Sequence, residues 1–378
     1  MDATDPALRV ERTATDDPDR GAWLAASFDD WYDVLVAGQA VGRTDPAPWQ
    51  RAELRAETER GRADAVVHRL LLRAGDEPVA AAELLLPSLD NTGTAYVAVT
   101  TAPAHRRRGL ATRLLAEAVE VAAAAGRGTL QADVDVPPAG PAAERERVAA
   151  TWPGVLAARA WGFVPGLEEA RRQLDLPVAE EVLRRLEEEA LPHAAGYRVR
   201  TVRGPVDDAD VDAVAALMAR MSTDAPQGEL TVEPERWDAA RVREGEALRA
   251  AQGRRQWLAL AQAPDGSLAG YTMLVQSAHE PERLLQWDTL VLREHRGHRL
   301  GLLLKLACLR VATADAPDAR RVSTWNAVSN APMIAVNEAM GFRWDETSVD
   351  LEAPLATVRA ALAARATSGV GTTAGAPA

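Results

Sequence analysis

The chain has 378 residues, which exceeds one typical hydrophobic core and suits two domains. Its formal net charge of −12 argues against general binding to nucleic-acid phosphates, because such binding needs a positive surface. No apolar run reaches the about 18 residues of a membrane span, and the single cysteine, Cys308, excludes an internal disulfide, so we expect a cytoplasmic protein with no nucleic-acid or membrane partner.

The first half of the chain predicts a regular alternation of strands and helices. The patterns follow one another in the order strand, helices, hairpin, strand, helix, strand. They cover residues 8–14, 19–60, 65–87, 94–101, 110–125 and 128–134. The next segment, PPAGPAAERERVAATWPG (137–154), is expected to be an irregular insertion. A helix that ends at the pair Gly162-Phe163 and a final strand after it complete this half.

The second half predicts the same order again. A polar helix within residues 178–196 links the halves, and the corresponding patterns then cover residues 197–203, 207–250, 254–276, 284–292, 300–314 and 320–326. The last helix ends at Gly341-Phe342, which matches Gly162-Phe163 although the chain has only three phenylalanines. We therefore expect two α+β domains of similar design, each with its own mixed sheet.

Each half contains a basic, glycine-bearing turn between a strand and a helix. The two turns are HRRRGLATRLL (105–115) and HRGHRLGLLLK (295–305). A turn of this kind at a helix start presents backbone N–H groups to a phosphate. Arg299 stands where such loops often carry glycine, and its guanidinium could bind the phosphate in place of lost N–H contacts.

The turns resemble those of a known family. The family pattern is Arg or Gln, any two residues, Gly, any residue, then Gly or Ala. The first turn matches it at Arg106, Gly109 and Ala111, and the second at Arg296 and Gly301. With the strand–turn–helix context in both halves, the chain resembles the GNAT superfamily of acyl-CoA N-acyltransferases. The resemblance implies an α+β fold of two tandem GNAT-like domains, each a mixed, splayed β-sheet flanked by helices.

The two domains are expected to meet at the helical linker. The expected segments are a disordered N-terminus, the N-terminal domain, the linker, the C-terminal domain and a disordered tail: residues 1–7, 8–176, 177–196, 197–365 and 366–378. In the family, the fourth and fifth strands diverge and pantetheine pairs with the open edge. The resemblance implies acetyl-CoA as acyl donor and a small-molecule primary amine as acceptor. The histidines show no ligand spacing, so no metal is expected.

The pyrophosphate of the cofactor is expected over one or both turns, at the start of the helix that follows each. The resemblance assigns these residues to cofactor binding: Arg106, Arg107, Arg108, Gly109, Leu110, Ala111, Thr112, Val291, Arg296, Gly297, His298, Arg299, Leu300, Gly301, Leu302 and Asn330. Asn330 is also expected to cap the helix after it.

The C-terminal half offers the better acceptor side. Asp288 lies inside an otherwise apolar strand just before the turn, and we expect it to be the general base that takes the proton of the amine. Asn337 stands where the family usually has a tyrosine, and it is expected to hydrogen-bond the departing thiolate. The N-terminal half has Ala158 at that place, and its nearest carboxylate on a predicted strand is Glu83. We therefore expect catalysis in the C-terminal half.

Structural roles remain open for these residues. Asp288 could have a purely structural role, as a hydrogen-bond partner of a neighbouring strand or loop. Asn337 could lie on an exposed helix face, and Asn330 could be a helix cap without any contact to a ligand. Lys305 is expected at the surface or near the adenosine phosphate. Cys308 is expected to be a small buried residue.

Other functions fit the same sequence. A CoA-binding regulatory or scaffolding protein without turnover is favoured by the missing tyrosine in both halves. A protein acetyltransferase is less consistent, because nothing in the chain predicts a peptide groove. A role in thiol-cofactor biosynthesis rests only on analogy with mycothiol synthases, which are also tandem GNAT proteins. The acceptor could be an amino sugar, a polyamine or an amino-acid derivative. The oligomeric state is also open, and a homodimer is possible.

Overall fold

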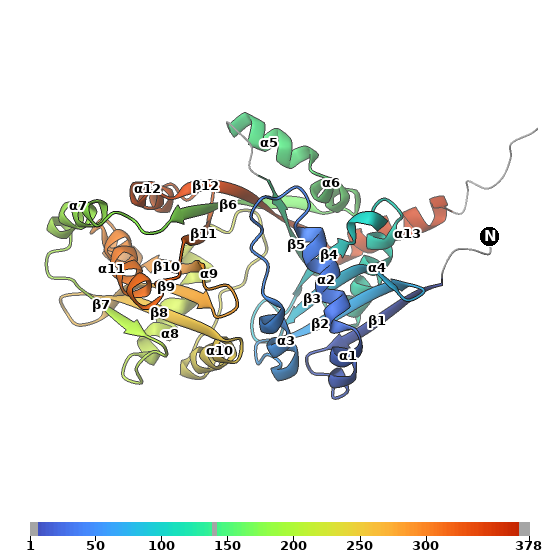
Figure 1. The fold of residues 1–378 in the computed structure, drawn as a ribbon, viewed down its shortest axis with the longest axis horizontal. Helices are drawn as coiled ribbons and strands as arrows, with labels where there is room; N and C mark the ends of the chain where they lie inside the picture. The colour runs from blue at the N-terminus through green and yellow to red at the C-terminus, as the bar shows by residue number, and fades with distance from the viewer. Residues whose placement is uncertain (1–6, 138–141, 370–378) are drawn as a thin grey trace, which may run out of the picture.

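The computed structural model describes residues 7–137 and 142–369 and has two lobes side by side along its long axis (Figure 1). The predictions made for residues 1–6 and 370–378 lie outside the described residues. Residues 366–369, however, belong to the last helix and not to a disordered tail. Within the described ranges, no helix is both long and apolar enough to cross a bilayer.

The N-terminal half follows the predicted order of elements. These are β1 (Leu8–Ala14), α1 (Arg20–Ala26), α2 (Phe28–Gln39), α3 (Arg51–Arg60), β2 (Ala65–Ala74), β3 (Glu77–Pro87), β4 (Thr94–Thr101), η1 (Pro103–His105), α4 (Leu110–Ala124), β5 (Thr129–Val136), α5 (Ala142–Thr151), α6 (Pro153–Ala160) and β6 (Val164–Asp175). The segment expected to be an irregular insertion, 137–154, contains α5 and the start of α6, and residues 138–141 within it lie outside the described residues.

The C-terminal half repeats this order after the polar linker, which forms a helix as predicted. Its elements are α7 (Glu180–Ala190), η2 (Leu191–His193), β7 (Arg198–Arg203), α8 (Val211–Ala219), α9 (Met221–Asp224), α10 (Ala239–Ala251), β8 (Arg254–Gln262), β9 (Leu268–Ser277), β10 (Arg283–Val291), η3 (Arg293–His295), α11 (Leu300–Asp315), β11 (Arg321–Ala327), α12 (Ala331–Met340), β12 (Arg343–Pro354) and α13 (Leu355–Gly369). Both predicted hairpins are present, β2–β3 and β8–β9.

The strands of both halves join one continuous sheet. In the described residues its order is β1-β2-β3-β4-β5-β12-β6-β11-β10-β9-β8-β7. Neighbouring strands are antiparallel except for β4–β5 and β10–β11, which are parallel. From each edge inward the first five strands follow chain order, so the repeat seen in the sequence is also a repeat of the fold.

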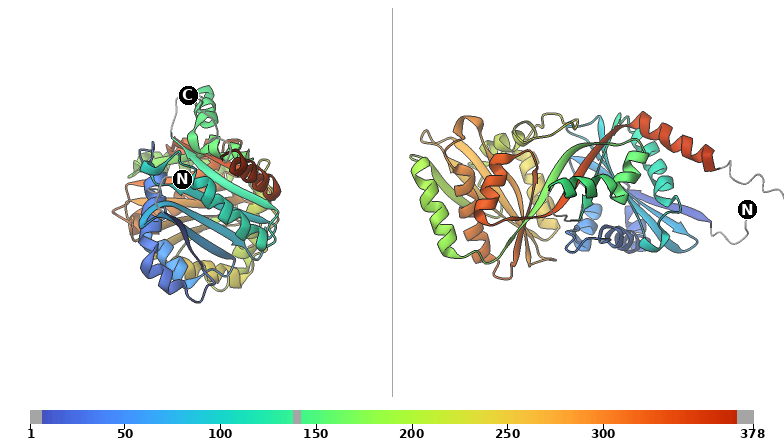
Figure 2. Two further views of the ribbon diagram at one scale, coloured as in Figure 1. Left: turned by 90° about the vertical axis from the view of Figure 1, so that its right-hand side faces the viewer. Right: turned by 90° about the horizontal axis from the view of Figure 1, so that it is seen from above.

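The last strand of each half is exchanged. β6, which ends the N-terminal half, pairs with β11, and β12, near the end of the chain, pairs with β5. The two exchanged strands also pair with each other, and they run between the lobes (Figure 2). The expectation of a separate sheet for each domain is therefore wrong, because neither half completes its sheet without a strand from the other.

Helices cover both faces of the sheet. In the N-terminal half, α1, α2 and α3 pack on the face that carries Leu71 and Ala81. The neighbouring residues Leu70 and Ala82 point to the other face, where they meet α4, because successive side chains on a strand alternate between faces. Each half is thus a three-layer unit, and the glycine-bearing turn leads into the helix on one face.

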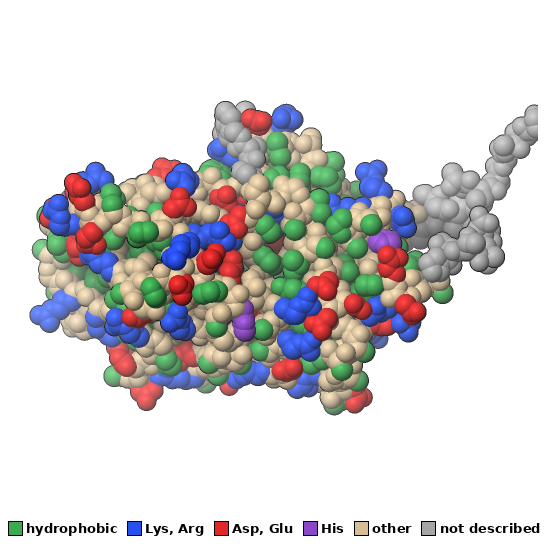
Figure 3. Space-filling model, viewed as in Figure 1, with side chains coloured by type: hydrophobic (Ala, Val, Ile, Leu, Met, Phe, Trp, Pro, Cys, Tyr) green, Lys and Arg blue, Asp and Glu red, His purple; other side chains and the backbone are tan. Residues whose placement is uncertain are grey.

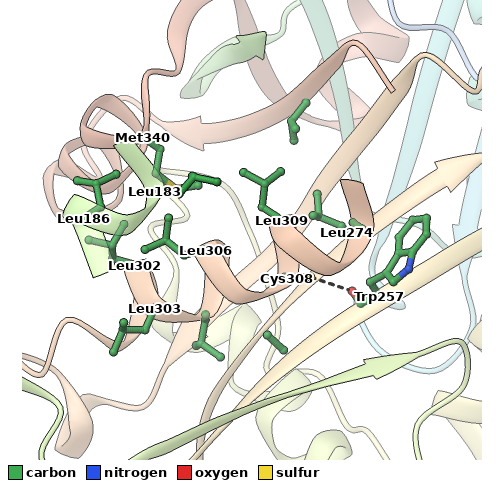
Figure 4. Packing of buried hydrophobic residues seen from close by; sticks show 14 of the residues in the cluster. Leu183, Leu186, Trp257, Leu274, Leu302, Leu303, Leu306, Cys308, Leu309 and Met340 are labelled. Carbon is green, nitrogen blue, oxygen red and sulfur yellow. Dashed lines mark hydrogen bonds between the residues drawn. The ribbon is translucent and has the colours of Figure 1, made fainter. Parts of the chain in front are cut away.

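Helix α11 is the centre of the C-terminal core. Figure 4 shows Leu302, Leu306 and Leu309 among leucines of α7 and Met340 of α12. Cys308 is fully buried, as predicted, and its thiol donates a hydrogen bond to a backbone carbonyl of β8 (3.3 Å). Because α11 is enclosed by β8 and β9 on one side and α7 on the other, it is apolar nearly all round.

Buried ion pairs join the two halves. The Arg254 guanidinium donates two hydrogen bonds to the Glu53 carboxylate (2.8 and 2.9 Å), and both side chains are only 2% exposed. Arg43 binds Glu346 in the same way (2.5 and 2.6 Å). Breaking a buried pair typically costs about 3–5 kcal/mol, so these contacts fix how the halves meet. On the outer face, by contrast, acidic and basic side chains are interspersed (Figure 3).

Candidate active site

The two glycine-bearing turns share one backbone conformation. The φ angles are +66° at Arg107 and +77° at Gly109 in the first turn, and +88° at Gly297 and +55° at Arg299 in the second. Glycine and arginine have therefore changed places between the turns, while the left-handed conformation is kept at both positions. This conformation costs a residue other than glycine about 1–2 kcal/mol, and Arg299 still serves as the N-cap residue of α11.

A large cavity opens at the C-terminal turn. β10 and β11 pair only over residues 283–286 and 321–324 and then separate, as expected of the fourth and fifth strands. The space between them belongs to a cavity of about 980 Å³, called here the turn cavity. The predicted site residues that line it are Asp288, Val291, Arg296, Gly297, Arg299, Leu300, Gly301, Leu302 and Asn330.

The turn cavity suits a ligand that carries phosphate. The first N–H groups of a helix have no partner within it, and the start of a helix carries a partial positive charge. At Gly297 an added Cβ would meet open space, so a ligand can approach the backbone there. Asn330 accepts a hydrogen bond from the Met333 N–H (3.3 Å), which confirms its predicted role as the cap of α12, and it also faces the cavity.

Two of the predicted turn residues have other partners. The His298 ring packs on Tyr197, with 4.9 Å between ring centroids, and its Nδ1 lies 2.9 Å from the His193 carbonyl oxygen. Arg296 lines the turn cavity but donates a hydrogen bond to Asp224 (3.1 Å). His298 thus faces the linker side, and Arg296 is held by a carboxylate.

Asp288 lies in a β-bulge beside the point where β10 and β11 separate. The register with β9 shifts between Gln286 and Thr289, which places an extra residue in β10. The hydroxyl of Tyr271, a fully buried residue, donates a hydrogen bond to the Asp288 carboxylate (2.8 Å). Burial raises the pKa of Asp288 above its ordinary value, and the hydrogen bond from Tyr271 opposes this rise. A carboxylate with a raised pKa is a stronger base than an ordinary one.

Asn337 lies in the core. The alternative that it lies on an exposed helix face is therefore wrong. Its side chain is 0% exposed, donates a hydrogen bond to Asn326 Oδ1 (2.5 Å) and accepts one from Lys305 Nζ (2.6 Å). The expectation of Lys305 at the surface is wrong, because α11 is enclosed and the ammonium group finds its partner inside. Burial lowers the pKa of Lys305 to about 7. Asn326, and not Asn337, lines the turn cavity.

In the N-terminal half a helix packs directly on the sheet near the corresponding turn. β4 and β5 also pair only near their starts. A Cβ added to Gly154 would lie 2.7 Å from Val134, so α6 packs directly on β5. Trp161 Nε1 donates a hydrogen bond to the Thr112 hydroxyl (3.2 Å) over the first turn of α4. The predicted site residues 106–112 form a largely exposed turn beside this contact.

A second cavity of about 630 Å³ lies between the halves and is called here the central cavity. Six carboxylates line it: Glu83, Asp133, Glu169, Glu235, Asp288 and Asp350. Its lining includes no Lys, Arg or His from the described part of the chain. Asp288 and Glu169 also line the turn cavity, so the two cavities meet there. The described residues contain no group of His, Cys, Asp or Glu placed to hold a metal ion.

Sequence reasoning found Asp288 and Glu83 but missed the other acids of the central cavity. Asp133, Glu169 and Asp350 stand on β5, β6 and β12, which only the strand exchange brings side by side. The alternating acids of β5, in the stretch ADVDV, were the available signal, since they place two carboxylates on one face of a strand.

Comparisons with known proteins agree with this geometry. The model of the acetyltransferase (GNAT) family matches residues 28–144 and 221–342, once in each half. A tandem GNAT protein from the clavulanic acid biosynthesis pathway, solved without acetyl-CoA, has 30% sequence identity and a TM-score of 0.70 over 92% of this chain and 99% of that one. A GCN5-related N-acetyltransferase from Sphaerobacter thermophilus shares the fold at a TM-score of 0.58 and 16% identity, over 92% of this chain and 96% of that one. A search of curated proteins gave no match.

The chain belongs to the GNAT acetyltransferase family, whose members are acyltransferases. The family model matches more than half of the chain, and the 30% identical relative is itself a tandem GNAT protein. The resemblance inferred from the two turns and the α+β fold class with two GNAT domains are both confirmed.

Proposed function

We propose that the protein is an acetyl-CoA-dependent N-acetyltransferase that acylates a primary amine of a small molecule, with the chemistry in the C-terminal half. The observation that carries this proposal is the junction at Asp288, where the turn cavity and the central cavity meet. A transferase must bring two substrates to one point, and a base must stand there to receive a proton. The acyltransferase activity of the family supports the same reaction class.

The turn cavity is the proposed site of the acyl donor. The N–H groups at the start of α11 and the guanidinium of Arg299 would hold the pyrophosphate. The open edges of β10 and β11 would receive the pantetheine chain as an added strand, with Val291 among the main-chain partners. The N-terminal turn, with α6 packed beside it, would have a structural role.

The central cavity is the proposed site of the acceptor amine. The amine nitrogen attacks the thioester carbonyl carbon, so that a C–N bond forms and the C–S bond breaks. Asp288 takes the proton that the nitrogen loses, and its raised pKa suits this role. Asn326 would donate a hydrogen bond to the departing thiolate, because its oxygen is already engaged by Asn337. Asn337 would then be a positioning residue behind Asn326.

The competing proposal is a CoA-binding protein without turnover. Alanine and asparagine, at Ala158 and Asn337, occupy the positions where the family usually has tyrosine, which favours this alternative. The carboxylate in the bulge of β10 favours the enzyme. We keep the cytoplasm as the proposed location, because the single cysteine excludes an internal disulfide.

Acetyl-CoA binding followed by turnover tests this function. A ligand that binds only the native state raises the melting temperature, so we expect a thermal shift with acetyl-CoA and release of free thiol once a primary amine is added. Thermal shift without thiol release over a panel of amines would favour the protein without turnover. No shift with acetyl-CoA or with longer acyl-CoAs would refute both.

A further inference from the structure

The central strands carry three neighbouring carboxylates on one face. Asp133 on β5 lies directly opposite Asp350 on β12, and Glu169 on β6 lies opposite Ser348, two positions from Asp350. Side chains two positions apart on a strand point to the same face, and all three acids line the central cavity. We call Asp133, Asp350 and Glu169 the carboxylate triad. Like charges opposite one another destabilise a sheet, so the triad needs a compensating partner.

The same face of the sheet is neutralised farther along. Asp135, the next residue on that face of β5, pairs with Arg43 (2.9 Å). Arg43 also pairs with Glu346 of β12, and Arg171 of β6 lies 3.1 Å from the same carboxylate. No side chain in the described ranges forms an ion pair or a hydrogen bond with the triad. The protein therefore supplies cations to one end of this face and leaves the cavity end anionic.

A buried hydroxyl faces the same side without a partner. Ser348 lies between Asp135 and Glu169 in the sheet and is only 6% exposed. It stands two residues from Asp350, so its side chain points to the face of the triad. Its hydroxyl forms no hydrogen bond with another described residue. The hydroxyl oxygen is not among the fully enclosed atoms that lack a partner, so a polar ligand or a water molecule can reach it and supply one.

The carboxyl groups of the triad have raised pKa values, so without a bound cation they are less ionised than ordinary carboxyl groups. Burial raises the pKa of Asp350 to about 8 and that of Asp133 to about 6, and neighbouring carboxylates add to both rises. The pKa of Glu169 is also raised, by burial and by Asp133. Asp135 adds negative charge, and Arg43 is the cation that offsets part of the effect on Asp133. A cation bound among these groups would favour their charged forms.

The other walls of the central cavity suit a hydrocarbon chain. Met218, Met221, Leu230 and Trp237 from the C-terminal half and Tyr96 from the N-terminal half line it. Methylene groups fit these walls, while Asn91, Gln131, Ser222 and Gln227 give the rest of the lining a polar character. The carboxylate of an amino acid would be repelled by the acids of the cavity.

We propose that the acceptor is an aliphatic diamine or polyamine. One ammonium group binds the carboxylate triad, the methylene chain lies along the apolar walls, and the other nitrogen reaches Asp288, where it loses its proton and is acylated. This acceptor class rests on the transferase function proposed above, since it names the second substrate of the same site.

Putrescine and butylamine form the matched pair that tests this acceptor class, because they differ only in the second amino group. We expect kcat/KM for putrescine to exceed that for butylamine at least about tenfold, as charge-assisted hydrogen bonds to the triad predict. Asp350→Asn should remove most of this preference. Asp135 lies on β5, beside β12 and on the same face of the sheet as Asp350, but outside the cavity. Asp135→Asn should therefore keep the preference for putrescine. Glu169→Gln gives a second variant at the triad.

The outcomes separate the acceptor class from the transferase function. Equal kcat/KM for the two amines, or an unchanged preference in folded Asp350→Asn and Glu169→Gln, would overturn the diamine while the transferase stands. Calorimetry with putrescine alone adds a readout that does not depend on turnover. Putrescine binding that is lost in Asp350→Asn, without thiol release, would support the cation site and refute the transferase. Failure of putrescine to bind in the presence or absence of acetyl-CoA would overturn the diamine.

Discussion

The two halves share a strand order and a turn conformation, yet they differ in what occupies the space beside the turn. In the N-terminal half, glycines let helices pack on strands: a Cβ at Gly154 would lie 2.7 Å from Val134, and one at Gly38 would lie 1.9 Å from Thr100. In the C-terminal half, Asn330, the N-cap residue of α12, lies on the wall of a cavity of about 980 Å³. Near the N-terminal turn a helix thus packs directly on the sheet, whereas a cavity opens at the C-terminal turn.

The half whose turn matches the family pattern better is not the half whose turn faces the large cavity. The N-terminal turn matches the family pattern at all its defining positions, whereas the C-terminal turn has Arg299 in place of a glycine. The backbone absorbs that change, because Arg299 adopts the left-handed conformation that Gly109 has in the other turn. Whether a cavity exists depends instead on how closely a helix approaches a strand, which residues such as Gly154 decide.

The largest effect on turnover is expected from a substitution of Asp288, the proposed general base of the C-terminal half. Asp288→Asn keeps the size of the side chain and removes the proton acceptor, so turnover near neutral pH should fall at least about a hundredfold, within the about 10²–10⁴-fold typical of a positioned base. Acetyl-CoA affinity should change little. Raising the pH should restore part of the activity, because the amine then loses its proton without help. Thiol release at saturating acetyl-CoA measures the effect.

Arg108→Glu in the N-terminal turn is the matched control. Arg108 is exposed and does not lie at a left-handed position, so the substitution should neither strain the backbone nor change turnover by more than about twofold. Loss of activity in Arg108→Glu together with normal activity in Asp288→Asn would move the chemistry to the N-terminal half.

The parts of the fold that the sequence predicted are those set by local patterns. The order of elements, the two hairpins and the cap at Asn330 follow from strand and helix periodicity and from turn and cap chemistry, which involve residues close in the chain. The exchange of β6 and β12 could not be predicted in this way. Two copies of one fold present equivalent edges, and the pattern of a strand does not say which edge it joins.

The same distinction between local patterns and long-range contacts decides which site residues could be predicted. Asp288 could be found because a single acid in an apolar strand is a local anomaly. Lys305 looked like a surface residue because its partner, Asn337, comes from another helix. The acids Asp133 and Asp350 belong to strands far apart in the sequence, and only the exchanged sheet makes them neighbours. Contacts across elements therefore account for what was missed.

A smaller effect is expected at the turn that faces the cavity. Arg299→Glu replaces a guanidinium on the wall of the turn cavity by a carboxylate. Acetyl-CoA affinity should fall at least about tenfold, since a hydrogen bond to a charged group contributes about 1.5–3 kcal/mol. Isothermal calorimetry measures it, and Arg108→Glu should bind normally. Unchanged affinity in both single variants and in the double variant would exclude both turns from the donor site.

The smallest effect on turnover is expected at the buried polar pair that distinguishes the two cores. Lys305 and Asn337 correspond to Leu115 and Ala158 in the N-terminal half. Asn337→Ala should lower turnover less than about tenfold, because Asn337 acts through Asn326, but it should destabilise the protein by about 1–3 kcal/mol, since Lys305 loses its partner. The double variant Lys305→Leu/Asn337→Ala should recover much of that stability, because replacing both partners by apolar groups can be nearly neutral. Urea unfolding measures both changes.

The same pair should give the stability a characteristic pH dependence. Burial lowers the pKa of Lys305 from 10.5 to about 7, so between these values the unfolded chain binds more protons than the native one. The free energy of unfolding should therefore rise with pH above about pH 7, by roughly 1 kcal/mol per pH unit. Burial also raises the pKa of Cys308, from 9.0 to about 12, which has the opposite effect above pH 9, and the comparison is best ended near pH 8.5 for that reason. Asp350 titrates in this range too, so the quantity to measure is the difference between the unmodified protein and Lys305→Leu/Asn337→Ala. Parallel pH curves for the two proteins would mean that Lys305 stays charged in the native core, held by Asn337 and by the ring of Phe342, whose centroid lies 5.3 Å from Nζ.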